Sequence, residues 1–186
     1  MIIAVDGPTA SGKGTIAKRL AAHFGVPHLD TGLLYRAVGR QVGLNEGDPD
    51  NAADAVAACD FPAELLEDEN LRSEEVGGMA SRISVHPAVR EALFKRQRAF
   101  AEQPGGAVLD GRDIGTSIAP DAEIKLFITA SVQERARRRW LEMTGREMEI
   151  SLEEIERDIV MRDERDITRK DAPLKAAPDA MVIDTT

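Results

Sequence analysis

Residues 7–15 read Gly7-Pro8-Thr9-Ala10-Ser11-Gly12-Lys13-Gly14-Thr15 and directly follow an aspartate that closes the apolar run Met1-Ile2-Ile3-Ala4-Val5. The run is short and rich in β-branched side chains, so it predicts a strand that is buried on both faces. After the loop, Ile16, Leu20 and Phe24 recur every four residues, which indicates a helix. The predicted order is strand, glycine-rich loop, helix.

This order is the context in which a phosphate-binding loop works, and Gly7, Gly12 and Lys13 match the spacing Gly-x-x-x-x-Gly-Lys. Glycines let successive backbone N–H groups point inward, the helix start adds the positive end of its dipole, and the lysine brings a mobile charge. A glycine-rich turn without a ligand is the structural alternative. We expect a polyphosphate to contact the whole loop, namely Gly7, Pro8, Thr9, Ala10, Ser11, Gly12, Lys13, Gly14 and Thr15.

The loop departs from the usual pattern in one position that concerns a metal ion. Gly14 follows the lysine where Ser or Thr is typical, and the hydroxyl comes one residue later, at Thr15. Direct coordination of Mg²⁺ by Thr15 and contact through a water molecule are both compatible with the sequence.

Composition limits the classes of function. The 186 residues, 42% hydrophobic and 31% charged, predict one globular domain, and the net charge of −9 argues against a nucleic-acid partner. The sequence has no apolar window of membrane-span length and starts with a strand rather than a signal peptide, so we expect no membrane partner and a cytoplasmic location. A single cysteine, Cys59, fits a reducing compartment. Anionic ligands must then be held by local arginine clusters.

Three further segments carry a family resemblance. They are residues 30–36 (Asp-Thr-Gly-Leu-Leu-Tyr-Arg), residues 110–116 (Asp-Gly-Arg-Asp-Ile-Gly-Thr) and residues 162–169, in which Arg-Asp-x-x-Asp-x-x-Arg occurs. Together with the loop they resemble the bacterial cytidylate kinases, which are P-loop nucleoside monophosphate kinases. Taken without the resemblance, Arg36 would be a solvated helix arginine, and Arg162 would belong to an ion-paired helix face with Asp166.

Alternating strands and helices predict an α/β fold, with parallel strands starting near residues 2, 27, 107, 124 and 180. The resemblance implies the three-layer fold of P-loop NTPases with a five-stranded parallel sheet. It also implies a single kinase domain over 1–186. Within that domain we expect a reduced, mostly helical NMP-binding subdomain at 37–90 and a short lid at 143–150.

The implied reaction is phosphoryl transfer from ATP, with Mg²⁺, to CMP or dCMP. The acceptor phosphate is already ionised, so no general base is needed, and positioning and charge neutralisation carry catalysis. By the resemblance, Lys13, Arg112, Arg162 and Arg169 are catalytic. Asp110, at the end of a buried strand, is placed to orient metal-bound water and forms the expected metal site with Thr15. The residues expected to bind the acceptor nucleotide are Thr31, Arg36, Ser81, Arg90, Arg112, Asp113, Arg162, Asp166 and Arg169.

Several lesser expectations and two alternative functions complete the analysis. A donor-side role is expected for one of Arg135, Arg138 and Arg139, and the three histidines are expected to be structural. Ser131 with Glu134, and Ser151 with Glu154, predict capping boxes. We expect a monomer. The alternatives are a small-metabolite P-loop kinase, of the shikimate or sugar-acid type, and a nucleotide-binding sensor without catalysis.

Overall fold

The computed structural model describes residues 1–144 and 150–186, and its centre is a five-stranded sheet in the order β2-β3-β1-β4-β5. Every pairing in the sheet is parallel, which confirms the predicted sheet and its starting points. The strands are β1 (Ile2–Asp6), β2 (His28–Asp30), β3 (Ala107–Gly111), β4 (Ile124–Thr129) and β5 (Met181–Asp184).

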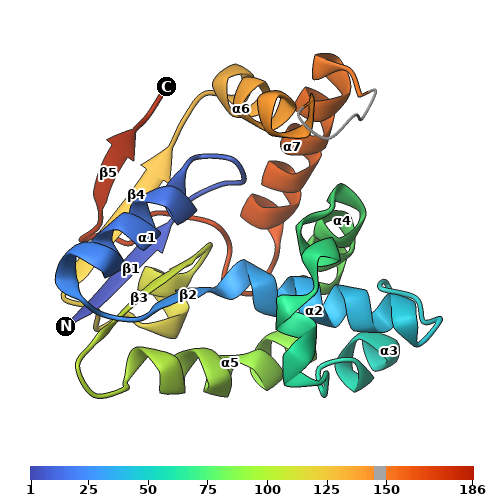
Figure 1. The fold of residues 1–186 in the computed structure, drawn as a ribbon, viewed down its shortest axis with the longest axis horizontal. Helices are drawn as coiled ribbons and strands as arrows, with labels where there is room; N and C mark the ends of the chain where they lie inside the picture. The colour runs from blue at the N-terminus through green and yellow to red at the C-terminus, as the bar shows by residue number, and fades with distance from the viewer. Residues whose placement is uncertain (145–149) are drawn as a thin grey trace.

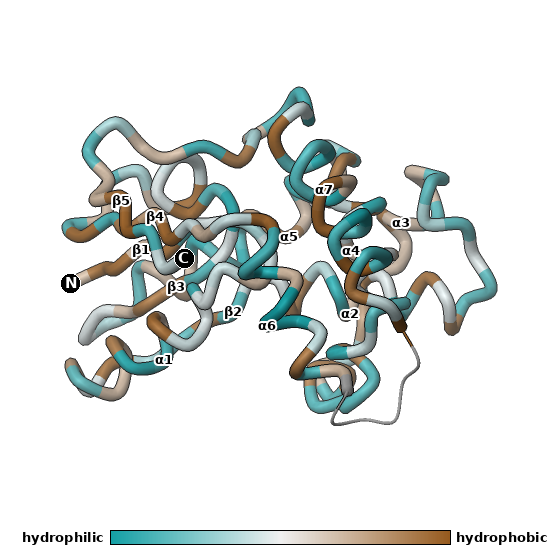
Figure 2. The backbone as a smooth tube through the Cα atoms, turned by 90° about the horizontal axis from the view of Figure 1, so that it is seen from above, coloured by the Kyte–Doolittle hydropathy of each residue, from teal (hydrophilic) through white to brown (hydrophobic). Residues whose placement is uncertain are grey.

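Helices cover both faces of the sheet, and this explains why the central strands β1 and β3 are apolar up to the aspartate near the carboxyl end of each. Ile3 and Val5 of β1 pack on one face against Ala17 and Ala21 of α1 (Lys13–Phe24). Ala4 packs on the other face, in the cluster that also holds the last residue of α5 (Pro87–Ala101). Figure 2 shows β1, β4 and β5 as predominantly hydrophobic, whereas α6 (Val132–Thr144) is mostly hydrophilic. In α1 the fully buried side chains are the small ones of Ala17 and Ala21. Phe24, at the end of the helix, stays 44% exposed.

Between β2 and α5, where a small acceptor subdomain is expected, the chain is mostly helical. It forms α2 (Thr31–Leu44), α3 (Ala52–Ala57), two short 3₁₀ turns (Ala63–Glu67 and Glu69–Arg72) and α4 (Glu74–Ile83). This stretch has a hydrophobic core of its own, built on fully buried side chains that include Leu34, Val38, Leu71 and Ile83. Figure 1 shows α2, α3 and α4 grouped beyond one edge of the sheet.

The helices α6 and α7 (Leu152–Thr168) pack against each other and flank the segment expected to form the lid. The capping box of Ser151 and Glu154 is confirmed, since both reciprocal hydrogen bonds are present. The box expected at Ser131 is wrong in one half: Ser131 Oγ accepts from the Glu134 N–H, but the Glu134 carboxylate accepts from Arg137 and Arg138. Charged donors one turn along the helix outcompete a backbone amide for this carboxylate.

Residues 145–149 of the expected lid lie outside the described residues. Its first and last residues are described: Met143 is buried, and Ile150 packs against the cluster between α6 and α7. Within the described part of the chain, no helix combines the length and the apolar character needed to cross a membrane.

Candidate active site

The glycine-rich loop follows the carboxyl end of β1, where ligands collect in open α/β sheets. Gly7 has a φ of 156°, and a Cβ at this position would overlap the carbonyl oxygen of Ile128. Gly12 is the N-cap of α1 with a left-handed φ of 85°. Only glycine fits both positions without strain, so the loop can lie against β4 and present the start of α1 to a ligand.

Lys13 is the first residue of α1, and its ammonium group lies over the loop, where Nζ donates to the carbonyl oxygen of Pro8 at 3.3 Å. Burial, with a further contribution from the nearby Arg112 guanidinium, lowers the pKa of Lys13 to about 8. A phosphate group in the loop would restore the charge of the ammonium group. Lys13 is therefore positioned to bind an anion held by the loop.

Asp6, the last residue of β1, was not predicted as a site residue, yet it fixes the turn that carries Arg112. Its two carboxylate oxygens accept from the backbone N–H groups of Ile114 and Gly115, each at 2.8 Å. Burial raises its pKa to about 6, against the opposing effect of these two hydrogen bonds. These bonds tie the end of β1 to the short π-helical turn Ile114–Ile118 and so set the position of residues 112 and 113.

The residues predicted to bind the acceptor lie around one cavity, together with Thr9 of the loop. They come from α2, α4, α5, the turn after β3, and α7 and its C-cap. The cavity lining contains all of Thr31, Arg36, Ser81, Arg90, Arg112, Asp113, Arg162, Asp166 and Arg169. The structure thus brings together residues that are up to 138 positions apart in the sequence, as between Thr31 and Arg169.

Inside this cavity, arginines pair with buried carboxylates. Arg112 Nε donates to Asp166 at 2.8 Å, while Asp113 accepts from Arg90 at 2.5 Å and from Arg169 at 3.3 Å. Burial opposes the charge of Arg112, but the carboxylates of Asp166, Asp110 and Asp30 together more than offset it and hold the pKa of Arg112 above its ordinary value. Burial and the neighbouring Arg90 lower the pKa of Arg169. The cavity is strongly cationic and suits a phosphate ester.

The last arginines depart from the arrangement that their spacing along a helix alone would favour. Arg162 does not pair with Asp166; its Nη2 donates to the Glu74 carboxylate at 2.8 Å. Arg169 is not on the helix face, because α7 ends at Thr168 and Arg169 is an extended C-cap. The extended backbone lets the Arg169 side chain reach Asp113, a contact that continued helical spacing would not have predicted.

Three predicted acceptor residues already have protein partners. Arg36 Nη1 donates to the carbonyl oxygens of Leu71 and Ser73, and Thr31 Oγ1 donates to the carbonyl oxygen of Asp110 at 2.8 Å. Burial and the neighbouring arginines lower the pKa of Arg36 to about 10. Ser81 Oγ accepts from Arg165 at 2.5 Å. Arg165, which sequence reasoning missed, therefore joins α7 to the acceptor side.

The three candidate donor-side arginines of α6 have different surroundings. Arg135 is buried and donates to the carbonyl oxygens of Thr9 and Ala130 and to the Asp163 carboxylate, so it connects the glycine-rich loop to α7. Arg138 donates to Thr185 and Glu134. Arg139 forms an ion pair with Glu74 and lines a second pocket beside Thr9. Arg135 thus connects parts of the fold, whereas Arg139 lines the second pocket.

Of the expected Mg²⁺ ligands, Thr15 is an exposed residue in the first turn of α1, and Asp110 is a buried residue near the end of β3. A Cβ on Gly14 would come 3.7 Å from Asp110 Oδ2, so this carboxylate faces the loop. The other oxygen of Asp110 accepts from His28 Nε2 at 2.6 Å. His28, which we expected to have only a structural role, therefore contacts a residue of the site. Among the described residues no cluster of three or more His, Cys, Asp or Glu could hold a metal ion. The two oxygen donors fit a magnesium ion held largely by nucleotide phosphates.

The parallel sheet, the glycine-rich loop at its carboxyl edge and the arginine-lined cavity beside it define a P-loop protein of the nucleotide-kinase class. The family model for cytidylate kinase matches residues 3–186, and this chain belongs to that family.

Curated relatives agree with this family. A cytidylate kinase from Methylobacterium sp. (strain 4-46) is 58% identical over 97% of this chain and 86% of its own length. Another, from Xanthobacter autotrophicus, is 54% identical over 100% of this chain and 89% of its own, and a third, from Caulobacter sp. (strain K31), is 52% identical over 100% and 86%. The Xanthobacter alignment extends over 187 residues, so this relative has no large insertion against the 186 residues of the chain. The shortness of the segment between β2 and α5 is thus shared with that relative.

Proposed function

We propose that this protein transfers the γ-phosphoryl group of ATP to CMP or dCMP, giving ADP and CDP or dCDP. The observation that carries the proposal is a cavity beside the glycine-rich loop whose lining includes every residue expected to bind the acceptor. Family membership and the names of the curated relatives support the same reaction.

In the proposed reaction an oxygen of the acceptor phosphate attacks the γ-phosphorus of ATP in line, and the bond from the γ-phosphorus to the bridging oxygen of ADP breaks. The attacking oxygen is already ionised near neutral pH, so no residue is needed to remove a proton. Lys13 contacts the phosphoryl group in transfer, while Arg112, Arg162 and Arg169 hold the acceptor phosphate and neutralise charge. The carboxylates of Asp113 and Asp166 keep two of these arginines in position.

Mg²⁺ is the proposed cofactor, with Thr15 and Asp110 as the residues that hold it directly or through water. Bound with ATP, the ion would neutralise phosphate charge and orient the donor. The hydrogen bond from His28 fixes the Asp110 carboxylate toward the loop.

We propose that the nucleoside part of the acceptor lies at the far end of the cavity from the loop. There Ser81, Arg90 and Asp113 offer hydrogen-bonding groups to the base, and Asp166 offers a carboxylate to the sugar. Arg90 lies 6.0 Å from the centre of the Tyr35 ring, which limits its movement. We further propose that the protein is a cytoplasmic monomer, which sedimentation at several concentrations would test.

The reaction is tested by following ADP formation from ATP and Mg²⁺ with CMP, dCMP, UMP, AMP and shikimate offered separately. We expect turnover with CMP and dCMP to exceed that with AMP and shikimate by orders of magnitude. Turnover of shikimate would instead identify a small-metabolite kinase. ATP binding without turnover of any acceptor would identify a nucleotide-binding sensor.

A further inference from the structure

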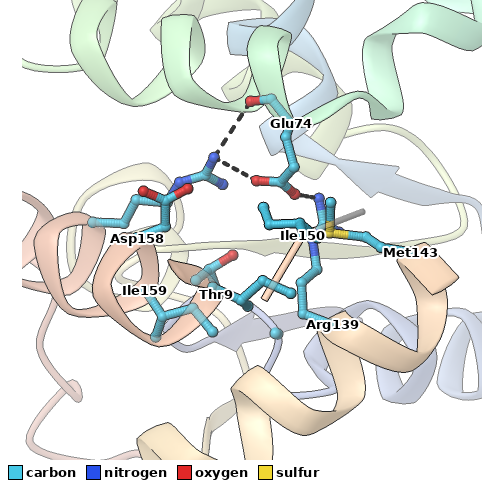
Figure 3. Close-up of a pocket in the computed structure, with 10 residues that line it drawn as sticks. Thr9, Glu74, Arg139, Met143, Ile150, Asp158 and Ile159 are labelled. Atoms are coloured by element: carbon cyan, nitrogen blue, oxygen red, sulfur yellow. Dashed lines mark hydrogen bonds and ion pairs between the residues drawn. The ribbon is translucent and has the colours of Figure 1, made fainter. Parts of the chain in front are cut away.

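Glu74, the first residue of α4, is a carboxylate that links two arginines of α6 and α7. Its Oε2 accepts from Arg162 Nη2 at 2.8 Å, and its Oε1 forms an ion pair with Arg139. Figure 3 shows Glu74 extending from α4 toward Arg139, with dashed lines for these interactions. The Glu74 carboxylate therefore connects α4 to α6 and α7, the two helices that flank the expected lid.

The position of Glu74 matters because its partners border both cavities of the site. Arg162 lines the acceptor cavity and also a second pocket, next to it, which Thr9 and Ala10 of the glycine-rich loop help to form. Arg139 lines the second pocket. A phosphate group that binds in this region would contact the guanidinium groups of Arg139 and Arg162, which are now paired with Glu74.

The charges around Glu74 explain why a carboxylate at this position stabilises the protein before nucleotide binds. Arg139 and Arg162 repel the nearby Arg36 guanidinium, and Arg112 repels Arg162; both Arg36 and Arg162 have lowered pKa values, for which burial is the main cause. Like charges at this separation cost free energy unless an anion lies between them. Glu74 supplies one such anion, in contact with both Arg139 and Arg162, and Asp158 supplies a second charge near Arg162. A nucleotide phosphate would supply another.

We propose that Glu74 is an internal counter-ion, which holds Arg139 and Arg162 in place before nucleotide binds and competes with nucleotide phosphate for their guanidinium groups. Glu74 is thus a positioning residue that sets the affinity of the site without contacting the reacting atoms. The inference rests on the proposed function only for the identity of the nucleotide.

The same contacts would also fit a clasp that closes the acceptor stretch onto α6 and α7 and so favours binding. The two roles predict opposite signs. A competing counter-ion weakens nucleotide binding and stabilises the free protein, whereas a clasp strengthens nucleotide binding. Removing the charge of Glu74 without changing its size therefore distinguishes them.

The experiment compares Glu74→Gln with Glu75→Gln. Glu75 is the next residue in the first turn of α4 and is exposed, and no ion pair of its side chain is found among the described residues. Both variants lose one charge at the same helix terminus, so effects of net charge and helix dipole are matched. CMP is titrated by calorimetry into wild type and both variants, and thermal unfolding is recorded with and without CMP.

For Glu74→Gln we expect the Kd of CMP to fall by roughly two- to tenfold, since a like charge near the phosphate is removed. We also expect a lower Tm of the free protein and a larger rise in Tm on adding CMP. Glu75→Gln should match wild type in all three. In steady state, Glu74→Gln should lower the KM for CMP without raising kcat. An unchanged or higher Kd for CMP in Glu74→Gln would overturn the proposal.

Pyrophosphate, titrated in parallel, separates this inference from the identity of the acceptor. If wild type does not bind CMP but pyrophosphate binds more tightly to Glu74→Gln, the proposed acceptor is wrong and the counter-ion role stands. If neither ligand binds more tightly to the variant, the counter-ion role is wrong. Glu74→Ala serves as a second variant, should the glutamine variant fold poorly, and is expected to change affinity in the same direction.

Discussion

Arg112 Nε donates a hydrogen bond of 2.8 Å to Oδ2 of Asp166, which joins the turn after β3 to α7 across the acceptor cavity. Two segments that are 54 residues apart thus share one partly buried ion pair. The pair keeps a guanidinium group, with its remaining donors, directed at the place where we expect phosphate to bind.

We expect Arg112→Lys to lower kcat by roughly 10²- to 10³-fold, because a lysine cannot hold Asp166 and a phosphate at the same time. Steady-state kinetics with ATP and CMP measure this loss, and circular dichroism checks the fold. Arg98→Lys is the control, since Arg98 also binds carboxylates, those of Asp121 and Glu102, but outside the cavity. Equal kcat values in the two variants would show that Arg112 is not a catalytic residue.

Arg90→Ala should mainly impair use of the acceptor. Arg90 donates to Asp113 and lies over the Tyr35 ring in the cavity, so we expect the KM for CMP to rise by roughly tenfold or more and the Kd of ATP to stay unchanged. Arg96→Ala is a matched control on the same helix, where Arg96 lies over the Phe61 ring at 5.3 Å, away from the cavity lining. A similar loss of ATP and CMP binding would place Arg90 in a structural role.

The affinity for ATP should depend on pH through Lys13. Its pKa of about 8 in the free protein means that the ammonium group loses its proton as the pH rises through 8. ATP prefers the charged lysine, so its Kd should be nearly constant between pH 7 and 7.5. It should then increase by up to about tenfold per unit above pH 8. Calorimetry from pH 7 to 9 measures this, with Lys13→Arg as the control, which should give a much flatter profile. A wild-type profile as flat as that of the variant would contradict the assignment.

Asp6→Asn should destabilise the fold. The two backbone N–H groups that Asp6 accepts from are buried, and an asparagine can accept from only one through its oxygen while its amide group opposes the other. We expect a loss of about 2 kcal/mol in the free energy of unfolding, measured by urea denaturation. Asp60→Asn, at an exposed position, should have little effect. Equal stability of the two variants would show that these hydrogen bonds do not anchor the turn.

The sheet and the glycine-rich loop could be predicted because their signals are local. Short apolar runs defined β1, β3, β4 and β5, and the spacing from Gly7 to Lys13 defined the loop and the start of α1. The acceptor residues gathered in the cavity came from the family resemblance, since neither Ser81 nor Arg90 has a local pattern that separates it from an ordinary helix residue.

The partners of the arginines could not be predicted in this way. Spacing along α7 favoured an ion pair between Arg162 and Asp166, but the tertiary structure pairs Arg162 with Glu74, which is 88 residues away in the sequence. Asp166 instead accepts from Arg112, 54 residues away. Asp6 was missed because an aspartate at the end of a strand has no motif of its own, and its role appears only when the turn after β3 lies beside it.

The most direct measurement of the central claim is to follow the γ-phosphate itself. ATP labelled in its γ-phosphate is incubated with CMP, Mg²⁺ and the protein, and the products are separated by chromatography, with Lys13→Met as the control. The account predicts that the label appears in CDP at wild-type turnover and at a rate lower by orders of magnitude with the variant. Label found only in inorganic phosphate, or equal transfer by wild type and variant, would contradict it.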